Sequence, residues 1–407
     1  MPTQVLSQIR GLSIPFPVRE RPRPFLEALK HIDYGHITVF TPDGNGLEFS
    51  GVEHGPTTYL RLGDWGVLDD LVARGEVGFV EAYMDGRWDT TDLPALITFV
   101  LMNSGSLERF FYGRPLQVLL TRLSYILHGN SLRGSKKNIM AHYDMGNDFY
   151  SLWLDKGMTY SGALFEGKPE RTLEEAQAAK YRRIIRKLGA QPGDHILEIG
   201  CGWGGFAEAA ADYGVKVTGI TISEKQASYA RERLYRAGRQ RFASIEMCDY
   251  RKASGQYDHV VSIGMFEHVG ERYWPAYFET IKKCLKPGGK AMVQTITLDD
   301  YLFESLHDYT GFMEQMIFPG GMLPSKSRFY EAAAKAGLEC RETYAFGQDY
   351  ARTTREWLNR FEEKKWEVRA LGYDEPFMRL WRFYLASCIA SFTSHRTDVM
   401  QAELQHA

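Results

Sequence analysis

The run "VVSIGMFEHVG" at residues 260–270 ends with Glu267 and His268 side by side. Its first half is apolar and predicts a buried strand, so both side chains enter a dry part of the molecule. Burying a carboxylate is unfavourable unless it has a partner or a chemical task. Glu267 is therefore a candidate base or anion-holding group, with capping of the following helix as the structural alternative. His268 is also a catalytic candidate, but we favour a hydrogen-bonded structural role for it.

A glycine-rich turn, "LEIGCGWGGFAEAA", predicts a ligand site between a strand and its helix. Glycines there let the backbone approach a ligand closely, and the helix N-terminus offers free N–H groups. A bare GxG is a weak signal, because any tight strand-to-helix turn favours glycine. Packing is the alternative, and we favour it for the cysteine. The candidate ligand-binding residues of this turn are Glu198, Gly200, Cys201, Gly202, Trp203 and Gly204.

The position of the acidic residue indicates which ligand the turn binds. A dinucleotide site has an acid at the end of the second strand for the ribose hydroxyls. Here that strand ends "GITISEKQ", with Thr221 and Ser223 at this place. The acid, Glu198, precedes the glycines instead, and "CDY" after the third strand supplies Asp249 and Tyr250 to hydrogen-bond or stack an adenine. This pattern favours S-adenosylmethionine over NAD.

A parallel sheet would bring these residues together. After residue 190, five apolar runs alternate with amphipathic segments, at "HILEIG", "VKVTGITI", "FASIEMC", "HVVSIGM" and "KAMVQTI". Such alternation predicts the α/β class, with helices on both faces of a parallel sheet. A long aromatic-rich insert, "DDYLFESLHDYTGFMEQMIFPGGMLPS", follows the fifth strand. We expect the rest of the chain to be mostly helical.

The N-terminal part has a different pattern. Residues 34–62 alternate short β-rich runs with "PDGNG" and "EHGP", which predicts a small sheet of hairpins. Helical segments follow, including "RPLQVLLTRLSYIL", and "HGNSLRGSKKN" has the composition of a basic connector. We therefore expect two domains, a smaller mixed α+β domain at residues 1–130 and an α/β domain at residues 131–407.

The composition argues against several classes of protein. The 407 residues carry 49 Lys and Arg against 51 Asp and Glu, without the basic excess of a nucleic-acid binder. The five cysteines have no CxxC spacing, which argues against a zinc site and for a reducing compartment. No apolar stretch is long enough to span a membrane, and the N-terminus does not resemble a signal peptide. We expect a soluble, cytoplasmic protein.

Several stretches together resemble the cyclopropane fatty acid synthases and mycolic acid cyclopropane synthases. They are "AHYDMGNDFYSLWLD", "MTYSGALF", "LEIGCGWGGFA", "GITISEKQ", "CDYR", "SIGMFEHVG", "IFPGGMLPS" and "FGQDY". The N-terminal domain resembles that of the phospholipid-acting branch. The resemblance implies a class I methyltransferase (Rossmann-like) domain with a helical insert, S-adenosylmethionine as donor and an acyl double bond as acceptor. The cofactor contacts it implies are Tyr160, Ser161, Gly200, Gly202, Thr221, Gln226, Asp249 and Tyr250.

In this family, the glutamate matching Glu267 helps hold a bicarbonate ion. The ion removes a proton from the added methyl group, so that a cyclopropane ring closes. Ile296 and Tyr350 match the isoleucine and tyrosine of the cage, but Gly162 and Gln294 replace its cysteine and histidine. Glycine should open volume, and glutamine can never be cationic. We therefore expect weakened bicarbonate binding.

Two products stay open. Without a base beside the new methyl group, the carbocation can lose a chain proton and give a methyl-branched alkene or a methylene group, which we favour. Otherwise Glu267, Tyr350 and backbone groups still bind bicarbonate, and the ring closes. Aromatic faces and exclusion of water would stabilise the carbocation in either case. Cys388 matches an active-site candidate of the family, but its small, buried neighbours favour packing.

The alternatives to a lipid methyltransferase are an NAD-dependent oxidoreductase, a non-catalytic lipid-binding protein on the same fold, and a methyltransferase for small soluble molecules. The last would leave the apolar insert and the N-terminal domain without a role. A bilayer phospholipid substrate requires peripheral membrane contact. For this, "RERPRPF" and the connector residues Arg133, Lys136 and Lys137 are candidates, with solvated linkers as the alternative. Relatives acting on phospholipids indicate a homodimer.

Overall fold

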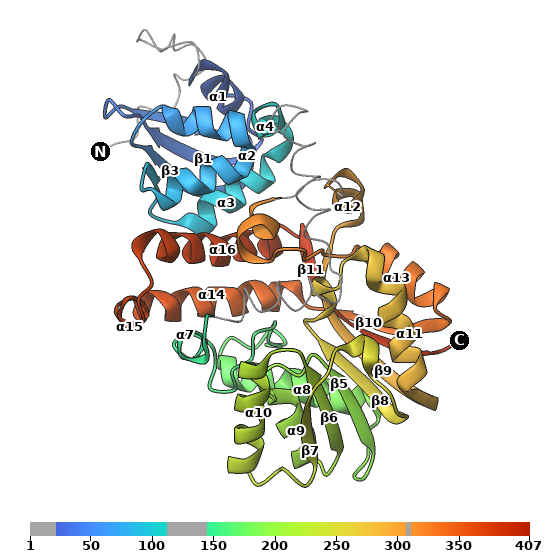
Figure 1. The fold of residues 1–407 in the computed structure, drawn as a ribbon. Coiled ribbons are helices and arrows are strands. Elements are labelled where there is room, and N and C mark those ends of the chain that lie inside the picture. The colour runs from blue at the N-terminus through green and yellow to red at the C-terminus, as the bar shows by residue number, and fades with distance from the viewer. Residues whose placement is uncertain (1–21, 112–144, 307–310) are drawn as a thin grey trace. The chain divides into compact units, whose positions relative to one another are not determined.

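Figure 1 shows the computed structural model, which describes residues 22–111, 145–306 and 311–407. The chain divides into two compact units, Met1–Arg114 and Pro115–Ala407. The predicted domain boundary at residue 130, the basic connector and the predicted helix at residues 114–127 lie outside the described residues.

The first unit contains a four-stranded sheet in the order β2-β1-β3-β4. Its strands are β1 (Tyr34–Phe40), β2 (Gly46–Ser50), β3 (Glu53–Leu62) and β4 (Trp88–Asp89), and its helices are α1 (Pro22–Leu29), α2 (Gly66–Met84), α3 (Leu93–Met102) and α4 (Ser104–Phe111). β1 and β2 form the expected antiparallel hairpin, whereas β3 runs parallel to β1, so the prediction of hairpins is wrong for that pair. The chain crosses beside β1 at Gly51, where a Cβ would lie 2.3 Å from the carbonyl oxygen of Asp33.

The second unit contains a seven-stranded sheet in the order β10-β11-β9-β8-β5-β6-β7. The five runs predicted from the sequence form its parallel strands β5 (His195–Ile199), β6 (Lys216–Thr221), β7 (Ala243–Met247), β8 (Tyr257–Ile263) and β9 (Leu285–Leu298). Two further strands, β10 (Leu338–Ala345) and β11 (Thr397–His406), pair antiparallel at the edge. Neither strand was predicted from the sequence, because polar residues interrupt the apolar pattern of both.

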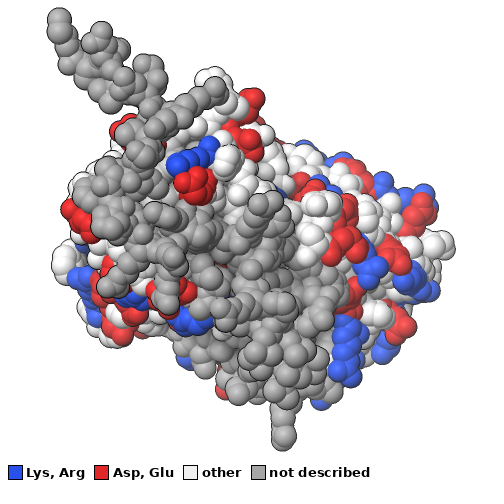
Figure 2. Space-filling model, turned by 90° about the horizontal axis from the view of Figure 1, so that it is seen from above, with Lys and Arg blue, Asp and Glu red and all other residues white. Residues whose placement is uncertain are grey.

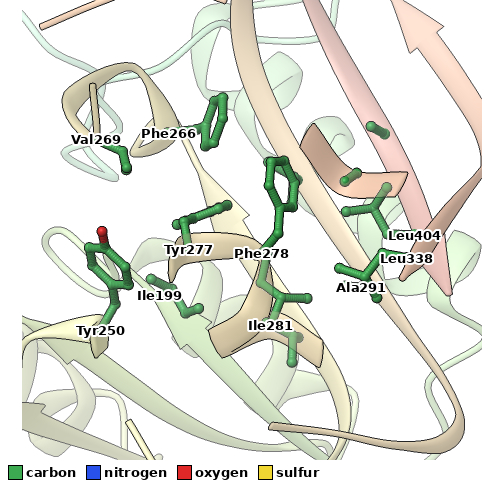
Figure 3. Packing of buried hydrophobic residues seen from close by; sticks show 14 of the residues in the cluster. Ile199, Tyr250, Phe266, Val269, Tyr277, Phe278, Ile281, Ala291, Leu338 and Leu404 are labelled. Carbon is green, nitrogen blue, oxygen red and sulfur yellow. The ribbon is translucent and has the colours of Figure 1, made fainter. Parts of the chain in front are cut away.

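Helices cover both faces of this sheet (Figure 1). The helices α8 (Leu173–Leu188), α9 (Gly205–Asp212) and α10 (Glu224–Arg236) contribute to one buried cluster with the sheet. The helices α11 (Trp274–Cys284) and α13 (Lys326–Lys335) contribute to a second cluster, in which Phe266, Tyr277 and Phe278 pack together (Figure 3). Because Phe266 and Val269 belong to this cluster, the short 3-10 turn Phe266–His268 that carries Glu267 is anchored in the core.

The remaining helical elements lie around the carboxyl edge of the sheet and in the C-terminal part. α7 (Asn147–Ser151) precedes α8, and the insert after β9 contains α12 (Asp300–Leu306) and a π-helical turn at Met313–Ile317. α14 (Gly347–Glu363) and α16 (Glu375–Thr393) lie side by side and are joined by α15 (Lys365–Ala370) (Figure 1). Short 3-10 turns occupy Tyr250–Lys252 and Glu271–Tyr273.

Two surface properties follow from the described part of the chain. None of its helices combines the length and the apolar character needed to cross a bilayer. On the face shown in Figure 2, acidic and basic side chains are interspersed, in keeping with a net charge of −2.

Candidate active site

A cavity lies at the carboxyl ends of β5, β6 and β8, where α/β folds commonly bind their ligands. It holds about 1050 Å³ of empty space, part of it open to solvent. Eleven of the thirteen predicted cofactor residues contribute to its wall. They are Tyr160, Ser161, Glu198, Gly200, Cys201, Gly202, Trp203, Thr221, Gln226, Asp249 and Tyr250.

The other two predicted cofactor residues, Gly204 and Ser223, are outside that wall and have structural roles. A Cβ on Gly204 would lie 3.0 Å from the Cβ of Ala230, so glycine lets α9 pack closely on α10. The Ser223 hydroxyl caps α10 by accepting a hydrogen bond from the N–H of Gln226. The sequence analysis missed the wall residues Tyr181 and Met265, which contact the cavity from α8 and from the turn before Phe266.

The glycine turn needs glycine for two different reasons. Gly200 has a φ of +79°, and a Cβ there would lie 2.9 Å from the Cγ of Met265. Gly202 has a φ of +50°, and a Cβ there would meet nothing within 4 Å. Gly200 therefore permits close packing, whereas Gly202 leaves open space beside the backbone for a ligand.

Glu198 places a buried carboxylate in the cavity wall. The residue is 3% exposed, and its Oε2 atom has no hydrogen-bond partner in the described part of the chain. Burial raises the pKa of Glu198 to about 8, and the positive charges of Arg233 and Lys180 oppose this shift. An unpartnered buried acceptor at a ligand cavity fits the ammonium and hydroxyl donors of S-adenosylmethionine. The residues present thus fit this cofactor.

The residues after β6 and β7 are held by hydrogen bonds of their own. Thr221 Oγ1 donates to Gln226 Oε1 over 3.1 Å, which fixes the orientation of the amide. The two carboxylate oxygens of Asp249 accept hydrogen bonds of 2.9 and 2.7 Å from the Arg251 guanidinium. Burial opposes the ionisation of Asp249, but these hydrogen bonds outweigh it and lower the pKa. An adenine would therefore share Asp249 with Arg251.

Glu267 is held in place by a strand backbone. Its Oε1 atom accepts a hydrogen bond of 2.7 Å from the N–H of Ile296 on β9. Its Oε2 atom is buried and has no hydrogen-bond partner among the described residues. Burial raises the pKa of Glu267 to about 7, against the lowering effect of backbone hydrogen bonds. The next helical segments begin after Gly270 and Tyr273, so Glu267 caps neither of them.

The predicted cage residues are neighbours in space. Gln294 lies two positions before Ile296 in the chain. Its carbonyl oxygen accepts a hydrogen bond of 2.9 Å from the N–H of Gly264. A Cβ on Gly264 would lie 3.5 Å from the Cβ of Ser161, which precedes Gly162 in the chain. The structure thus brings the strand ends that carry the cage residues next to the wall of the cofactor cavity.

The expectation that Gly162 opens volume is wrong. A Cβ at this position would lie 2.9 Å from the Cγ and Cδ1 atoms of Tyr350. The Tyr350 ring is stacked on Phe392, with 4.5 Å between ring centroids, and therefore has support on its other side. The aromatic ring thus occupies the space that a side chain at position 162 would need.

Gln294 is bound into a polar network from the missed strand β11. The residue is 1% exposed, and its Oε1 atom accepts a hydrogen bond of 3.0 Å from Gln401 Nε2. Gln401 Oε1 in turn accepts one of 2.5 Å from Arg183 Nη1. The Gln294 amide therefore has a fixed orientation, set by residues more than 100 positions away in the sequence.

His268 and Cys388 differ from the other catalytic candidates. His268 contributes to the wall of the cofactor cavity, whereas Glu267, Gln294 and Tyr350 do not. Burial lowers the pKa of His268 to about 4, so its imidazole is neutral at neutral pH. Burial raises the pKa of the Cys388 thiol to about 12, which keeps the thiol protonated and unreactive.

The chain matches a family of known proteins over more than half of its length. Residues 130–402 match the family described as mycolic acid cyclopropane synthetase. The chain belongs to this family. It is 36% identical over 339 residues to the tuberculostearic acid methyltransferase UfaA1 of Mycobacterium tuberculosis, covering 80% of this chain and 78% of that protein. It is 33% identical over 338 residues to the cyclopropane-fatty-acyl-phospholipid synthase of Escherichia coli K12, covering 81% and 83% of the two chains.

Solved structures of the family have the same fold. The cyclopropane synthase MmaA2 of Mycobacterium tuberculosis superposes with a TM-score of 0.62 at 33% identity, covering 66% of this chain and 97% of that one. The mycolic acid cyclopropane synthase CmaA1, in complex with SAH and CTAB, has a TM-score of 0.61 at 31% identity, with 66% and 98% covered. The predicted class I methyltransferase fold is confirmed. The protein is an S-adenosylmethionine-dependent methyltransferase of this family and acts on lipids.

Proposed function

We propose that this enzyme methylates the double bond of an unsaturated fatty acyl chain in a phospholipid. We further propose that it releases a methyl-branched or methylene product and not a cyclopropane. The altered cage around Glu267 carries this proposal, with Tyr350 packed on Gly162 and Gln294 bound to Gln401. The alternative is ring closure with bicarbonate, as in a cyclopropane-fatty-acyl-phospholipid synthase. A non-catalytic lipid-binding protein is the more distant alternative.

Bound S-adenosylmethionine supplies an electrophilic methyl group, whose bond to sulfur breaks as a bond to one alkene carbon forms and the other carbon becomes cationic. The residues of the chain then determine which proton leaves. Glu267 Oε2 is a buried acceptor without a hydrogen-bond partner in the described residues, so it can take a proton directly. Removal from the methyl-bearing carbon gives a branched alkene. Hydride migration from that carbon to the cationic carbon, followed by removal of a methyl proton, gives a methylene group, whereas removal from the new methyl group with C–C closure gives the ring.

The neutral side chain at position 294 supports the branched alkene as the product. A histidine at position 294 could become cationic and attract a bicarbonate ion, whereas the Gln294 amide stays neutral. The Gln294 oxygen is already bound to Gln401, which fixes the direction of the amide. A closely similar relative is named as a methyltransferase, UfaA1, which favours this reading, while the name of the Escherichia coli relative favours a phospholipid acceptor.

Product analysis tests the proposal. Purified enzyme would be incubated with methyl-labelled S-adenosylmethionine and vesicles of cis-monounsaturated phospholipid, and the fatty acid methyl esters analysed by gas chromatography and mass spectrometry before and after mild hydrogenation. We expect a labelled product that takes up hydrogen and becomes a methyl-branched saturated chain. A labelled ring that survives mild hydrogenation would contradict the proposed product. Absence of label from lipid would contradict the lipid acceptor itself.

Restoring the family residue at position 294 provides the matched variant. Gln294→His should increase the fraction of ring product, because it returns a possible cation to the cage, whereas a side chain at position 162 would displace the Tyr350 ring. Gln256→His, on an exposed residue, is the control for the histidine and should leave the product ratio unchanged. An unchanged ratio in folded Gln294→His would show that the residue at position 294 does not select the product.

We also propose peripheral contact with the membrane and a homodimer. The basic residues suggested for this contact, Arg133, Lys136 and Lys137, lie outside the described residues. Each lysine near an anionic surface contributes about 1 kcal/mol, so Lys136→Ala with Lys137→Ala should weaken binding to anionic vesicles in co-sedimentation. Equal binding of both proteins would contradict this contact. Sedimentation velocity of the free enzyme tests the dimer.

A further inference from the structure

One face of α8 presents three polar side chains to the segment Met158–Ser161. Gln177 Nε2 donates to the carbonyl oxygen of Ser161 over 2.8 Å, and Lys180 Nζ donates to Ser161 Oγ over 2.5 Å. Tyr181 OH donates to Thr159 Oγ1 over 3.3 Å. Spacings of three and four residues place side chains on one face of a helix, which explains how they converge on one short segment.

This segment is part of the cofactor cavity wall over its whole length, from Met158 to Ser161. At its start, the Asp155 carboxylate accepts hydrogen bonds of 2.7 and 2.8 Å from the N–H groups of Gly157 and Thr159. At its end, Ser161 is followed by Gly162, on which the Tyr350 ring packs. The position of Ser161 therefore affects both the donor cavity and the acceptor side.

Lys180 is the unusual member of this group, because it is a fully buried lysine with 0% exposure. Lysine is rarely buried without a paired charge. The charged groups that face it are two carboxylates, Asp155 before the segment and Glu198 on β5. Tyr181, Arg233 and the Cys201 thiol are the other titratable or charged groups that interact with Glu198 among the described residues. Lys180 itself is not part of the cavity wall, so any effect it has on the cofactor is indirect.

We propose that Lys180 is a positioning residue for the methyl donor. Its ammonium group holds the Ser161 hydroxyl at the cavity and favours the ionised form of the Glu198 carboxyl group, which attracts the positively charged donor. The inference concerns the donor side alone and holds for either acyl product.

The charges around Lys180 predict the direction in which its removal changes donor binding. Burial lowers the pKa of Lys180 to about 7, and Asp155 and Glu198 oppose this shift by favouring the charged form. Replacing Lys180 with methionine removes one of the two positive charges that favour ionised Glu198, leaving Arg233. The pKa of Glu198 then rises further, and at neutral pH the carboxyl group is more often protonated. Donor binding should weaken and should recover as the pH is raised.

Isothermal titration calorimetry of the full chain tests the proposal without turnover. The dissociation constants of S-adenosylmethionine and S-adenosylhomocysteine would be measured from about pH 6 to about pH 9 for wild type, Lys180→Met and Lys180→Arg. One pKa unit corresponds to a tenfold change, so we expect Lys180→Met to bind S-adenosylmethionine about tenfold more weakly near neutral pH. The loss should shrink at high pH, and Lys180→Arg should retain tighter binding than Lys180→Met.

Lys187→Met is the matched control, because Lys187 lies on the same helix and its ammonium binds the exposed Glu342 carboxylate over 2.7 Å. It should bind both ligands as wild type does. Unchanged binding by a folded Lys180→Met, or a loss without the pH shift, would overturn the proposal.

Ser161→Ala keeps the test decisive if Lys180→Met does not fold. It removes the acceptor of the lysine hydrogen bond and leaves the buried charge in place. We expect an increase of about fivefold in the dissociation constant of the donor, with melting temperature recorded in parallel. Wild-type affinity in a folded Ser161→Ala would count against the proposal.

Discussion

Glu198 on β5 lines the cavity, whereas Glu267 lies in the turn after β8 with its carboxylate bound to the N–H of Ile296 on β9. Each is a buried glutamate whose Oε2 atom has no hydrogen-bond partner in the described ranges of the chain. Burial raises the two pKa values to about 8 and about 7. Glu198 faces the cations Lys180 and Arg233, whereas the groups that act on Glu267 in the described residues are backbone N–H groups and Thr295.

The two carboxylates differ in their neighbours: cations favour the ionised form of Glu198, but burial outweighs them and its pKa stays the higher of the two. Glu198 lies among positive charges that favour its ionised form, which suits it to hold a cationic ligand. Glu267, with a pKa of about 7, has protonated and ionised forms that are close in free energy at neutral pH, which suits it to the proposed role of proton acceptor. Each prediction below changes one side of this comparison and leaves the other in place.

The largest effect is expected from Glu267→Gln. General bases contribute about 10²- to 10⁴-fold to rates, and methyl incorporation into lipid should fall by this factor. Affinity for S-adenosylhomocysteine, measured by calorimetry, should stay unchanged because the donor cavity is intact. Glu363→Gln, at an exposed position, is the control. Full activity in Glu267→Gln would remove this residue from the chemistry.

Glu198→Gln should weaken donor binding more than it lowers the rate of methyl transfer. Hydrogen bonds to charged groups contribute about 1.5–3 kcal/mol, so the dissociation constant of S-adenosylmethionine should rise about 10- to 100-fold. The rate at saturating donor should change less, since Glu267 is untouched. Calorimetry together with KM and kcat for the donor separates the two effects. A loss confined to kcat would show that Glu198 does not act through donor binding.

Gly162→Ala should destabilise the fold through Tyr350. The added Cβ would lie 2.9 Å from the ring, and overpacking of this kind typically costs about 1–3 kcal/mol. Chemical denaturation measures the free energy of unfolding. Tyr350→Ala in the same chain should remove most of this penalty, which a double-mutant cycle would detect. Additive effects would mean that the two residues are not in contact.

The last expected effect is on the pH dependence of stability. The folded-state pKa of Glu267 is raised from 4.5 to about 7, so between these values the folded protein binds more protons than the unfolded chain. This contribution to stability falls as the pH rises through that window. Glu267→Gln has no carboxyl group that titrates at this position. The melting temperature of the variant minus that of wild type should therefore increase from about pH 5 to about pH 8. A constant difference would contradict the raised pKa.

Sequence patterns were sufficient for the parallel strands and for most of the donor cavity. Strands β5, β6 and β8 and the C-terminal part of β9 are largely buried, so they are apolar runs that can be recognised without tertiary information, and β7 at the sheet edge alternates buried and exposed residues. The glycine turn and the residues after β6 and β7 are local features of strand ends. Strand β11 was missed because Gln401 and Glu403 are buried in it, and their polar groups are paired with Gln294 and Lys290 on another strand.

The family and the methyl donor were thus contained in the sequence, since both depend on local motifs. The tertiary structure alone decided that the Tyr350 ring fills the space beside Gly162, that Gln401 holds Gln294, and that Lys180 supports Ser161. Each of these contacts joins residues that are separated along the chain. No local pattern records such contacts, because packing and charge pairing arise only when the chain has folded.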